Sequence, residues 1–215
     1  GVADAFCDIT TKTCAVSGNA CNPPDYRIGV INTDTLHAGA GELRQAGLCV
    51  PSAGAQRTGE FAYCQQAADC AAPNSFCDIN QSLRFVAADT QGAASAFSSL
   101  VSVGTEGGAR EAGIEAAAIA LGRQTDRATG QWMPAPAANG TFLRNDASLF
   151  VIFVSDEDDS SFGEVPYFYR AFETLKGAGN EGVVSVSAIV GDPDIDGENG
   201  PETGGCVPVQ GSAFN

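Results

Sequence analysis

Acidic side chains gather directly after the most apolar segment of the chain. Residues 149–154 read LFVIFV, and after Ser155 come Asp156, Glu157, Asp158 and Asp159. Carboxylates held this close repel one another, which raises their pKa values unless positive charge lies among them. The chain has only 11 Lys and Arg against 26 Asp and Glu, so a divalent cation is the simplest source of that charge. We therefore expect Asp156 and Asp158 to bind a metal ion.

A second acidic segment has the spacing of a calcium loop. Residues 192–197 read DPDIDG, in which alternate carboxylates can converge on one hard cation while the glycine permits a sharp turn. Position twelve of the loop is Thr203 rather than the glutamate of an EF-hand, so another glutamate or water would complete the shell. The segment predicts Ca²⁺, and the alternative is a solvated acidic turn. The predicted ligands are Asp192, Asp194, Asp196 and Glu198.

The cysteines indicate disulfide bonds. The sequence contains no Cys-x-x-Cys pair and a single histidine, His37, which argues against a zinc site. An even number of cysteines is typical of a disulfide framework, and disulfides persist in oxidising compartments. Reduced structural thiols are the alternative, and the pairing cannot be assigned from sequence. The eight residues are Cys7, Cys14, Cys21, Cys49, Cys64, Cys70, Cys77 and Cys206.

The overall charge excludes several classes of partner. The formal net charge is −15 and the isoelectric point is near 4.2. Nucleic acids and anionic membrane surfaces require basic patches that this composition does not supply. No apolar stretch reaches the roughly 18 to 20 residues of a membrane span. Cations are the favoured ligands.

Hydrophobic patterns predict alternating strands and helices. Compact apolar runs predict strands over residues 26–32, 83–87, 149–154 and 183–190. Helical spacing predicts helices near residues 90–101, 108–121 and 167–176, with Asp89 and Thr90 capping the first. We expect Ala93, Phe97, Leu100 and Val101 to form the inner face of the first helix, and Phe168, Phe172 and Leu175 that of the last.

This order predicts an α/β fold with a mostly parallel central sheet flanked by helices. The unbroken apolar run at 149–154 suggests that helices cover both faces of the sheet. We expect a Cys-rich segment at residues 1–25 and one α/β domain at 26–215, with a Cys-rich insertion at about 35–80. The carboxyl ends of parallel strands share one rim, which would gather Asp34, Asp156 and Asp192.

Several segments resemble von Willebrand factor A domains, which include the integrin inserted domains. The strand and acid SLFVIFVSD at 148–156 are similar to the fourth strand of that family, and Val103-Gly-Thr105 to its metal-binding threonine segment. The segments GTEGGAREAGIEAAAIAL, NGTFLRNDASLFVIFVSDEDDSS and LKGAGNEGVVSVSAIVGDP resemble the A-like domains of secreted, Cys-rich lipoproteins from myxobacteria and their relatives. The resemblance spans roughly residues 25–192.

The resemblance implies a metal-ion-dependent adhesion site that uses Thr105 and Asp156. Such a site holds Mg²⁺ or Mn²⁺ and leaves one position open for a carboxylate of the partner. The Asp-x-Ser-x-Ser motif that ends the family's first strand does not occur here. That strand would lie before Gly1 or come from another chain, or else the metal site is degenerate; Glu106 or Glu111 are alternative ligands.

These observations predict an exported, extracellular or cell-surface binding module that is not an enzyme. Its partner would be a protein or cell-surface ligand, engaged through a carboxylate at Ca²⁺ or Mg²⁺. The rival hypothesis is a structural subunit of a surface assembly or filament, stiffened by calcium and disulfides. Clustered aspartates also occur in metal-assisted hydrolases. The sequence has no Gly-x-Ser-x-Gly, no Walker-type loop and no cysteine left over as a nucleophile, which disfavours an enzyme.

Overall fold

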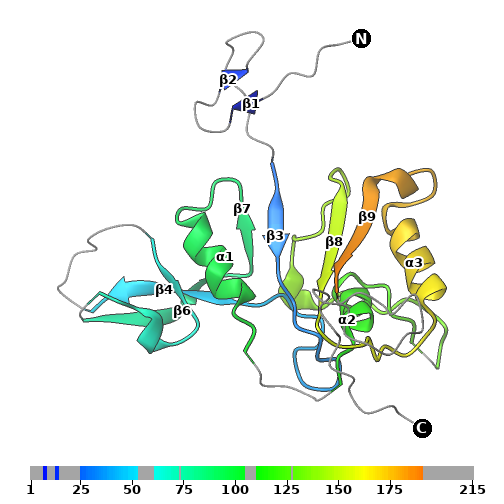
Figure 1. The fold of residues 1–215 in the computed structure, drawn as a ribbon, viewed down its shortest axis with the longest axis horizontal. Coiled ribbons are helices and arrows are strands. Elements are labelled where there is room, and N and C mark those ends of the chain that lie inside the picture. The colour runs from blue at the N-terminus through cyan, green and yellow to red at the C-terminus, as the bar shows by residue number, and fades with distance from the viewer. Residues whose placement is uncertain are drawn as a thin grey trace, which may run out of the picture. The chain divides into compact units, whose positions relative to one another are not determined.

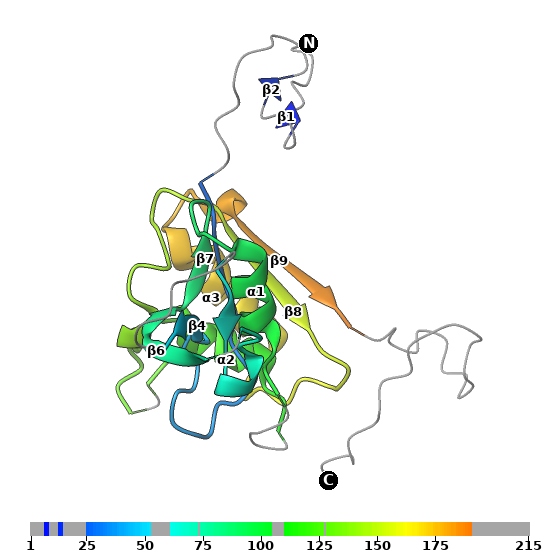
Figure 2. The ribbon, with the colours of Figure 1, turned by 90° about the vertical axis from the view of Figure 1, so that its left-hand side faces the viewer.

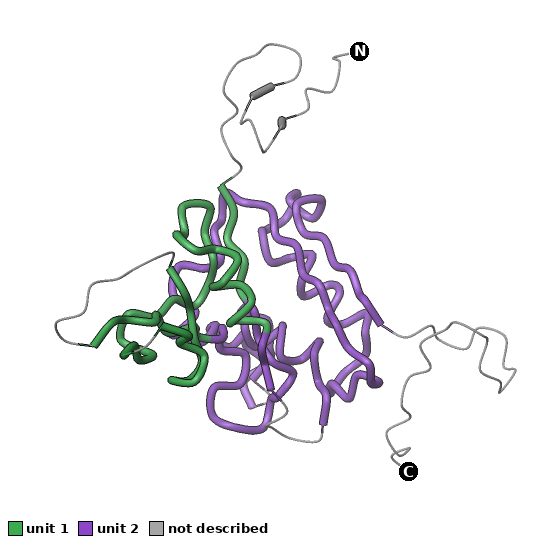
Figure 3. The backbone as a smooth tube through the Cα atoms, turned by 60° about the vertical axis from the view of Figure 1, so that its left-hand side comes forward, with its two compact units in different colours: residues 1–29, 45–101 green, residues 30–44, 102–215 purple. Residues whose placement is uncertain are grey.

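The chain forms two compact units. A computed structural model describes residues 25–52, 61–72, 74–104, 110–126 and 128–190, and the backbone at 7–8 and 13–14. Unit 1 comprises residues 1–29 and 45–101, and unit 2 comprises residues 30–44 and 102–215 (Figure 3). The expected division into a 1–25 segment and a 26–215 domain with an insertion at about 35–80 stays a prediction.

Unit 1 contains small antiparallel sheets. Strand β4 (Ala46–Pro51) is central to a three-stranded sheet, with β5 (Tyr63–Cys64) on one side and β6 (Ser75–Leu83) on the other. Strand β3 (Arg27–Gly29) pairs with β7 (Phe85–Ala87), and β1 (Cys7–Asp8) pairs with β2 (Thr13–Cys14) (Figure 1). The predicted strands at 26–32 and 83–87 are therefore present but shorter, and the Cys-rich region has a sheet of its own.

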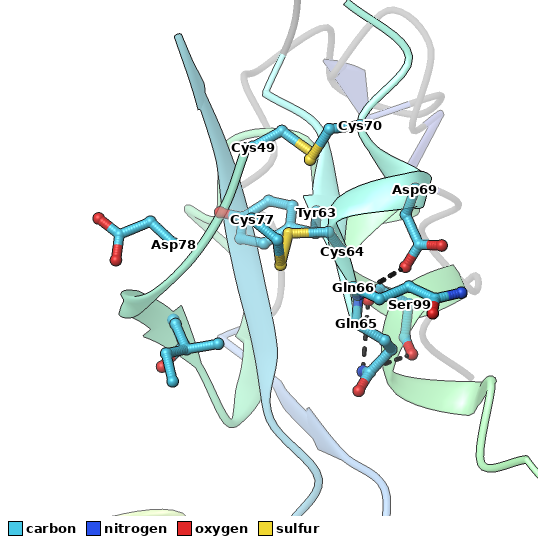
Figure 4. The surroundings of a disulfide bond; sticks show 12 residues. Cys49, Tyr63, Cys64, Gln65, Gln66, Asp69, Cys70, Cys77, Asp78 and Ser99 are labelled. Atoms are coloured by element: carbon cyan, nitrogen blue, oxygen red, sulfur yellow. Dashed lines mark hydrogen bonds between the residues drawn. A yellow bond between two sulfur atoms is a disulfide. The ribbon is translucent and has the colours of Figure 1, made fainter. Parts of the chain in front are cut away.

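Two disulfides stabilise the β5-β4-β6 sheet, one between a strand and a turn and one between two strands. Cys49 of β4 is bonded to Cys70, which follows the short 3₁₀ turn Ala67–Asp69, and Cys64 of β5 is bonded to Cys77 of β6 (Figure 4). These bonds confirm the prediction of disulfides for four cysteines. Only the backbone of Cys7 and Cys14 is described, and Cys21 and Cys206 lie outside the described residues.

Helix α1 (Ala93–Val101) does not bury the face that its sequence suggests. Its buried residues are Ala96, Ser99 and Leu100, whereas Phe97 and Val101 are exposed. Ser95 of α1 instead faces β5, where its Oγ accepts a hydrogen bond from the backbone N–H of Tyr63 at 2.9 Å. Thr90 does not cap the helix, because its hydroxyl accepts a hydrogen bond from the Ala87 N–H at 2.8 Å.

Unit 2 is built on a parallel pair of strands. Strand β8 (Leu149–Val154) runs beside β9 (Val184–Ile189), with Leu149 opposite Val184 and Val154 opposite Ile189 (Figure 2). Its helices are α2 (Gly113–Ala120) and α3 (Val165–Glu173). Short 3₁₀ turns cover Ala137–Asn139, Thr174–Lys176 and Glu181–Val183. The described fold is thus mixed α and β. It contains one parallel pair, and the predicted strands β3 and β7 pair antiparallel with each other, so the described strands do not show a mostly parallel central sheet.

The core of unit 2 lies between this pair and the helices. It contains alanines and a leucine from α2 and its carboxyl end, and Phe168, Phe172 and Leu175 from α3 and the turn after it, as predicted. Small alanine side chains let α2 approach its neighbours closely. The inward side chains of the strands pack against this cluster; they are Leu149, Val151, Phe153 and Val184.

The other face of β8 is exposed, contrary to the expectation that helices cover both faces. Phe150, Ile152 and Val154 are 61%, 53% and 70% exposed. Successive side chains of a strand point to opposite faces, so the run LFVIFV supplies one packed row and one open row. A continuous apolar run therefore does not by itself show that both faces of a strand are covered.

A buried asparagine holds the segment before unit 1's sheet in place within unit 2. Asn139 Oδ1 accepts a hydrogen bond from Leu43 N–H at 2.8 Å, and its Nδ2 donates to the carbonyls of Gly41 and Ala120, each at 3.0 Å. A buried amide that makes all these bonds fixes the position of both backbones. Residues 30–44 are thereby attached to the carboxyl end of α2.

Gly47 should be sensitive to substitution. A Cβ atom there would lie 2.8 Å from Cys77 Sγ and 3.3 Å from Cys64 Sγ. Because the disulfide cannot move away freely, we expect Gly47→Ala to lower the free energy of unfolding by about 1 to 3 kcal/mol. Gly182→Ala is the control, since nothing lies within 4 Å of its added Cβ. Urea denaturation of both variants measures the difference; equal stability would contradict the placement of this disulfide.

Paired substitutions in β8 test which face is packed. Phe153→Thr removes a ring from the core cluster, and we expect a loss of about 2 kcal/mol or more. Phe150→Thr changes an exposed ring to a residue that also favours strands, so we expect a change within about 0.5 kcal/mol. The two free energies of unfolding, measured in urea, should differ in this order. The reverse order would show that the inward and outward rows are misassigned.

Candidate functional site

The acidic loop begins where β8 ends. Ser155 N–H donates to the Ile189 carbonyl at 3.2 Å, and Ser155 Oγ accepts from Glu157 N–H at 3.1 Å. The loop turns away from the strand here, which leaves the Asp156 and Asp158 side chains exposed. Neither carboxylate hydrogen-bonds to another side chain or backbone group in the described part of the chain. Both are free to take a ligand.

Asp159 has a different role, because it caps helix α2. Its Oδ2 accepts a hydrogen bond from Ile114 N–H at 3.0 Å, and Ser161 Oγ accepts one from Glu115 N–H at 2.8 Å. The first N–H groups of a helix have no partner within the helix, and Ala112 at its start has no side-chain acceptor. The helix N-terminus also favours negative charge. One member of the acidic cluster is therefore balanced by backbone rather than by a cation.

The start of α2 connects the acidic loop to residues 30–34. Ser160 N–H donates to the Glu111 carbonyl at 2.6 Å, and Ala112 N–H donates to the Thr33 carbonyl at 3.3 Å. The Thr33 hydroxyl donates to the Glu111 carboxylate. A hydroxyl and a carboxylate thus lie together beside the loop, and both are oxygen ligands of the kind that hard cations prefer.

Asp34, expected at the rim of the sheet, has hydrogen-bond partners within its own turn. Oδ1 accepts from Leu36 N–H at 2.9 Å, and Oδ2 lies 2.7 Å from His37 Nδ1. The hydrogen bond from the Leu36 amide is the main reason that the pKa of Asp34 lies below its ordinary value, and His37 lowers this pKa further. Its carboxylate therefore stays ionised without a metal ion.

The described residues supply only part of the predicted metal site. Within the described ranges, three or more potential metal-ligating side chains of His, Cys, Asp or Glu come within 4.8 Å of one another only at Cys49, Cys64 and Cys70. Those sulfurs belong to disulfides, so they are not thiolate ligands. Asp156 and Asp158 are available, and further ligands would come from elsewhere. The predicted ligands Thr105, Asp192, Asp194, Asp196 and Glu198 lie outside the described residues.

A buried acid next to the loop was not expected from the sequence. Glu115 of α2 is only 6% exposed. Its carboxylate accepts from Arg110 Nη2 at 3.3 Å, Gln124 Nε2 at 3.0 Å and Phe162 N–H at 3.2 Å. Arg110 in turn donates from Nε to the Ser160 carbonyl at 2.8 Å and lies 3.9 Å above the Phe162 ring. Every oxygen of the buried carboxylate has a donor, as burial of a charge requires.

This ion pair lines a cavity of about 480 Å³ within unit 2. Exposed apolar side chains form part of its lining, and polar side chains from either end of α2 form the rest. The volume falls in the range of small-molecule and side-chain pockets. The lining includes Leu36, Arg110, Glu115, Asp126, Met133 and Phe162.

Comparison with known proteins gives no relative for this chain. No protein-family model, curated protein or solved structure matches it.

The described helices include none that combines the length and apolarity needed to cross a membrane. The longest, α1 and α3, have nine residues each.

Removal of the cap on α2 should destabilise unit 2. Asp159→Ala deletes the acceptor of the Ile114 N–H, and we expect the free energy of unfolding to fall by about 1 kcal/mol. Glu157→Ala, in the same loop, removes the same charge from an exposed side chain and should leave stability unchanged. Thermal melting in EDTA makes the comparison without metal ions. Equal melting temperatures would show that Asp159 does not cap the helix.

Proposed function

We propose that the protein is an extracellular, non-enzymatic binding module that holds a divalent cation beyond the carboxyl end of β8. One contrast carries this proposal. Glu111, Glu115 and Asp159 have donors from this chain, whereas Asp156 and Asp158 have none among the described residues. Two neighbouring exposed carboxylates without donors are the groups that a cation would stabilise most.

The metal would be held by hard oxygen ligands. Asp156 and Asp158 would supply carboxylates, with Thr105 supplying a hydroxyl, and water filling other positions. Mg²⁺ keeps several waters in such sites, and Ca²⁺ accepts more protein oxygens, which suits Asp192, Asp194, Asp196 and Glu198. A cation with an exchangeable water can bind a carboxylate of a partner. Residues 155–161 would then form the adhesion surface.

The same proposal includes the family and the wider fold. A von Willebrand factor A-like domain, with a mostly parallel sheet, is consistent with the parallel pair β8–β9 and with helices α2 and α3 packed on one face. In such sheets ligands bind beyond the carboxyl ends of the strands. The acidic loop occupies that position relative to β8.

An extracellular location is supported by the disulfides. Cys49–Cys70 and Cys64–Cys77 fit an oxidising compartment, since cytosolic thiols are kept reduced. We propose that the protein is exported and acts in the medium or at the cell surface, in the manner of the secreted bacterial lipoproteins that its sequence resembles. Its ligand would be a protein or another surface molecule.

A structural role is the second candidate function. The exposed row Phe150, Ile152 and Val154 makes an apolar surface next to strand edges that pair with no other described strand. Surfaces of this kind mark contacts with other chains. On this hypothesis calcium and disulfides stiffen a subunit of a surface assembly or filament, and no open coordination position is needed.

Metal titration followed by thermal melting tests both functions. At ten times the dissociation constant, a bound ion should add about 1.4 kcal/mol to the free energy of unfolding and raise the melting temperature by about 3 to 5 °C. We expect Asp156→Ala to abolish the shift at the rim site and Asp192→Ala to abolish it at the calcium loop. Asp89→Ala, an exposed acid in unit 1, is the control.

Two results would contradict the binding proposal. The first is a melting temperature that neither Ca²⁺ nor Mg²⁺ changes. The second is metal stabilisation that a glutamate-containing peptide does not alter, since an open coordination position should take the peptide's carboxylate. The second result favours the structural role.

A further inference from the structure

We propose that the cavity in unit 2 binds the side chain of a lysine or arginine from a partner protein, with Asp126 as its counter-charge. This site is separate from the proposed metal site, and it does not depend on a bound metal ion. Its lining comes from residues 35–36, from Arg110 and Glu115 at the start of α2, from residues 124–126 and 133 after that helix, and from Phe162. The side chains on which the inference depends belong to a single unit.

The charges around the cavity leave one carboxylate unbalanced. Arg110 and Glu115 form an ion pair, and every hydrogen-bonding oxygen of Glu115 already has a donor. Asp126 Oδ1 accepts from Ala128 N–H at 2.7 Å and from Thr129 N–H at 3.3 Å. Asp126 Oδ2 receives no hydrogen bond from the described residues. Among the described lining residues the charges therefore sum to one net negative charge, and Asp126 Oδ2 has no donor from them.

The remaining polar groups also favour a donor. Gln124 uses its Nε2 on Glu115, which leaves its Oε1 without a donor among the described side chains. Arg110 is committed to Glu115 and to the Ser160 carbonyl, and its guanidinium stacks on Phe162. A ligand that brings N–H groups would satisfy the free oxygens of Asp126 and Gln124. A ligand that brings acceptors would not.

Three ligand classes can be compared on these grounds. An anion would face Asp126 in a chain whose net charge is −15. A metal ion would find no group of three ligating side chains among the described residues of the lining. A monovalent organic cation fits, because its charged end can meet Asp126 while its stem contacts the apolar lining formed by Leu36, Met133 and Phe162.

The size of the cavity favours a side chain attached to a peptide over a free amine. A volume of about 480 Å³ is larger than one lysine or arginine side chain, so it leaves room for flanking peptide groups. A protein partner is consistent with the proposed binding function. Free alkylamines share the same charged group and are compared in the experiment.

Binding of a blocked lysine tests the inference. The probe is N-acetyl-lysine-N-methylamide, titrated in EDTA so that the metal site cannot contribute. Trp132 is the single tryptophan of the chain, is 48% exposed, and precedes Met133 of the lining, so its fluorescence reports the site. Calorimetry gives an independent dissociation constant. We expect saturable binding that weakens as salt is added.

Matched variants and ligands identify the contacts. Asp126→Asn keeps the Oδ1 acceptor of the turn but removes the charge, and we expect about tenfold weaker binding of the probe with an unchanged melting temperature. Asp89→Asn removes the same charge in unit 1 and should bind as the parent does. N-acetyl-norleucine-N-methylamide, which lacks the ammonium, should also bind about tenfold more weakly.

Several results would overturn the inference. Equal affinity of the parent and Asp126→Asn for the probe would show that Asp126 is not the counter-charge. Equal affinity of the parent for the lysine and norleucine probes would show that the site does not recognise a cation. Absence of both heat and fluorescence change at tens of millimolar would exclude the site. Butylamine binding as tightly as the blocked lysine would overturn the assignment to a protein side chain, and weaker binding of butylamine would support it.

Discussion

The docking of the acidic loop onto the first turn of α2 is the contact on which the rest of unit 2 depends. Asp159 and Ser161 accept the N–H groups of Ile114 and Glu115, and Ser160 N–H donates to the Glu111 carbonyl. These bonds satisfy helix donors that would otherwise have no protein partner. They also fix the end of the loop that leads to Phe162 of the cavity lining, while Asp156 and Asp158 near its start stay exposed.

The negative charge beyond β8 therefore has more than one explanation. Some carboxylates are balanced within the chain: Asp159 by a helix terminus, Glu115 by Arg110, and Asp34 by its own turn and His37. A carboxylate can be stabilised by a helix dipole or by backbone amides, and it does not need a bound cation for this. The number of acidic residues in a sequence cluster is consequently larger than the number of carboxylates that need a metal ion for charge balance. The exposed pair Asp156 and Asp158 is the part that contacts among the described residues do not explain.

Sequence patterns predicted what depends on local periodicity. The strand at Leu149–Val154 and the inward residues of α3 follow from the spacing of apolar side chains, and the even set of cysteines predicted the disulfides. The outer face of β8, the buried face of α1 and the burial of Glu115 were not predictable, because each is decided by partners distant in sequence. Glu115, for example, accepts from Phe162, 47 positions away. An acid within an alanine-rich helix otherwise suggests an exposed position.

The two proposed sites share one structural element, and this has a thermodynamic consequence. The loop from Ser155 to Phe162 carries the proposed metal ligands at its start and lines the cavity at its end. A cation held by Asp156 and Asp158 would restrict the loop, and a side chain in the cavity would restrict Phe162. Where two ligands order the same segment, the second to bind has less conformational entropy to lose. Linkage requires any such effect to be equal in both directions. The bound metal ion would strengthen binding of the lysine or arginine side chain by the same factor by which that side chain strengthens binding of the metal ion.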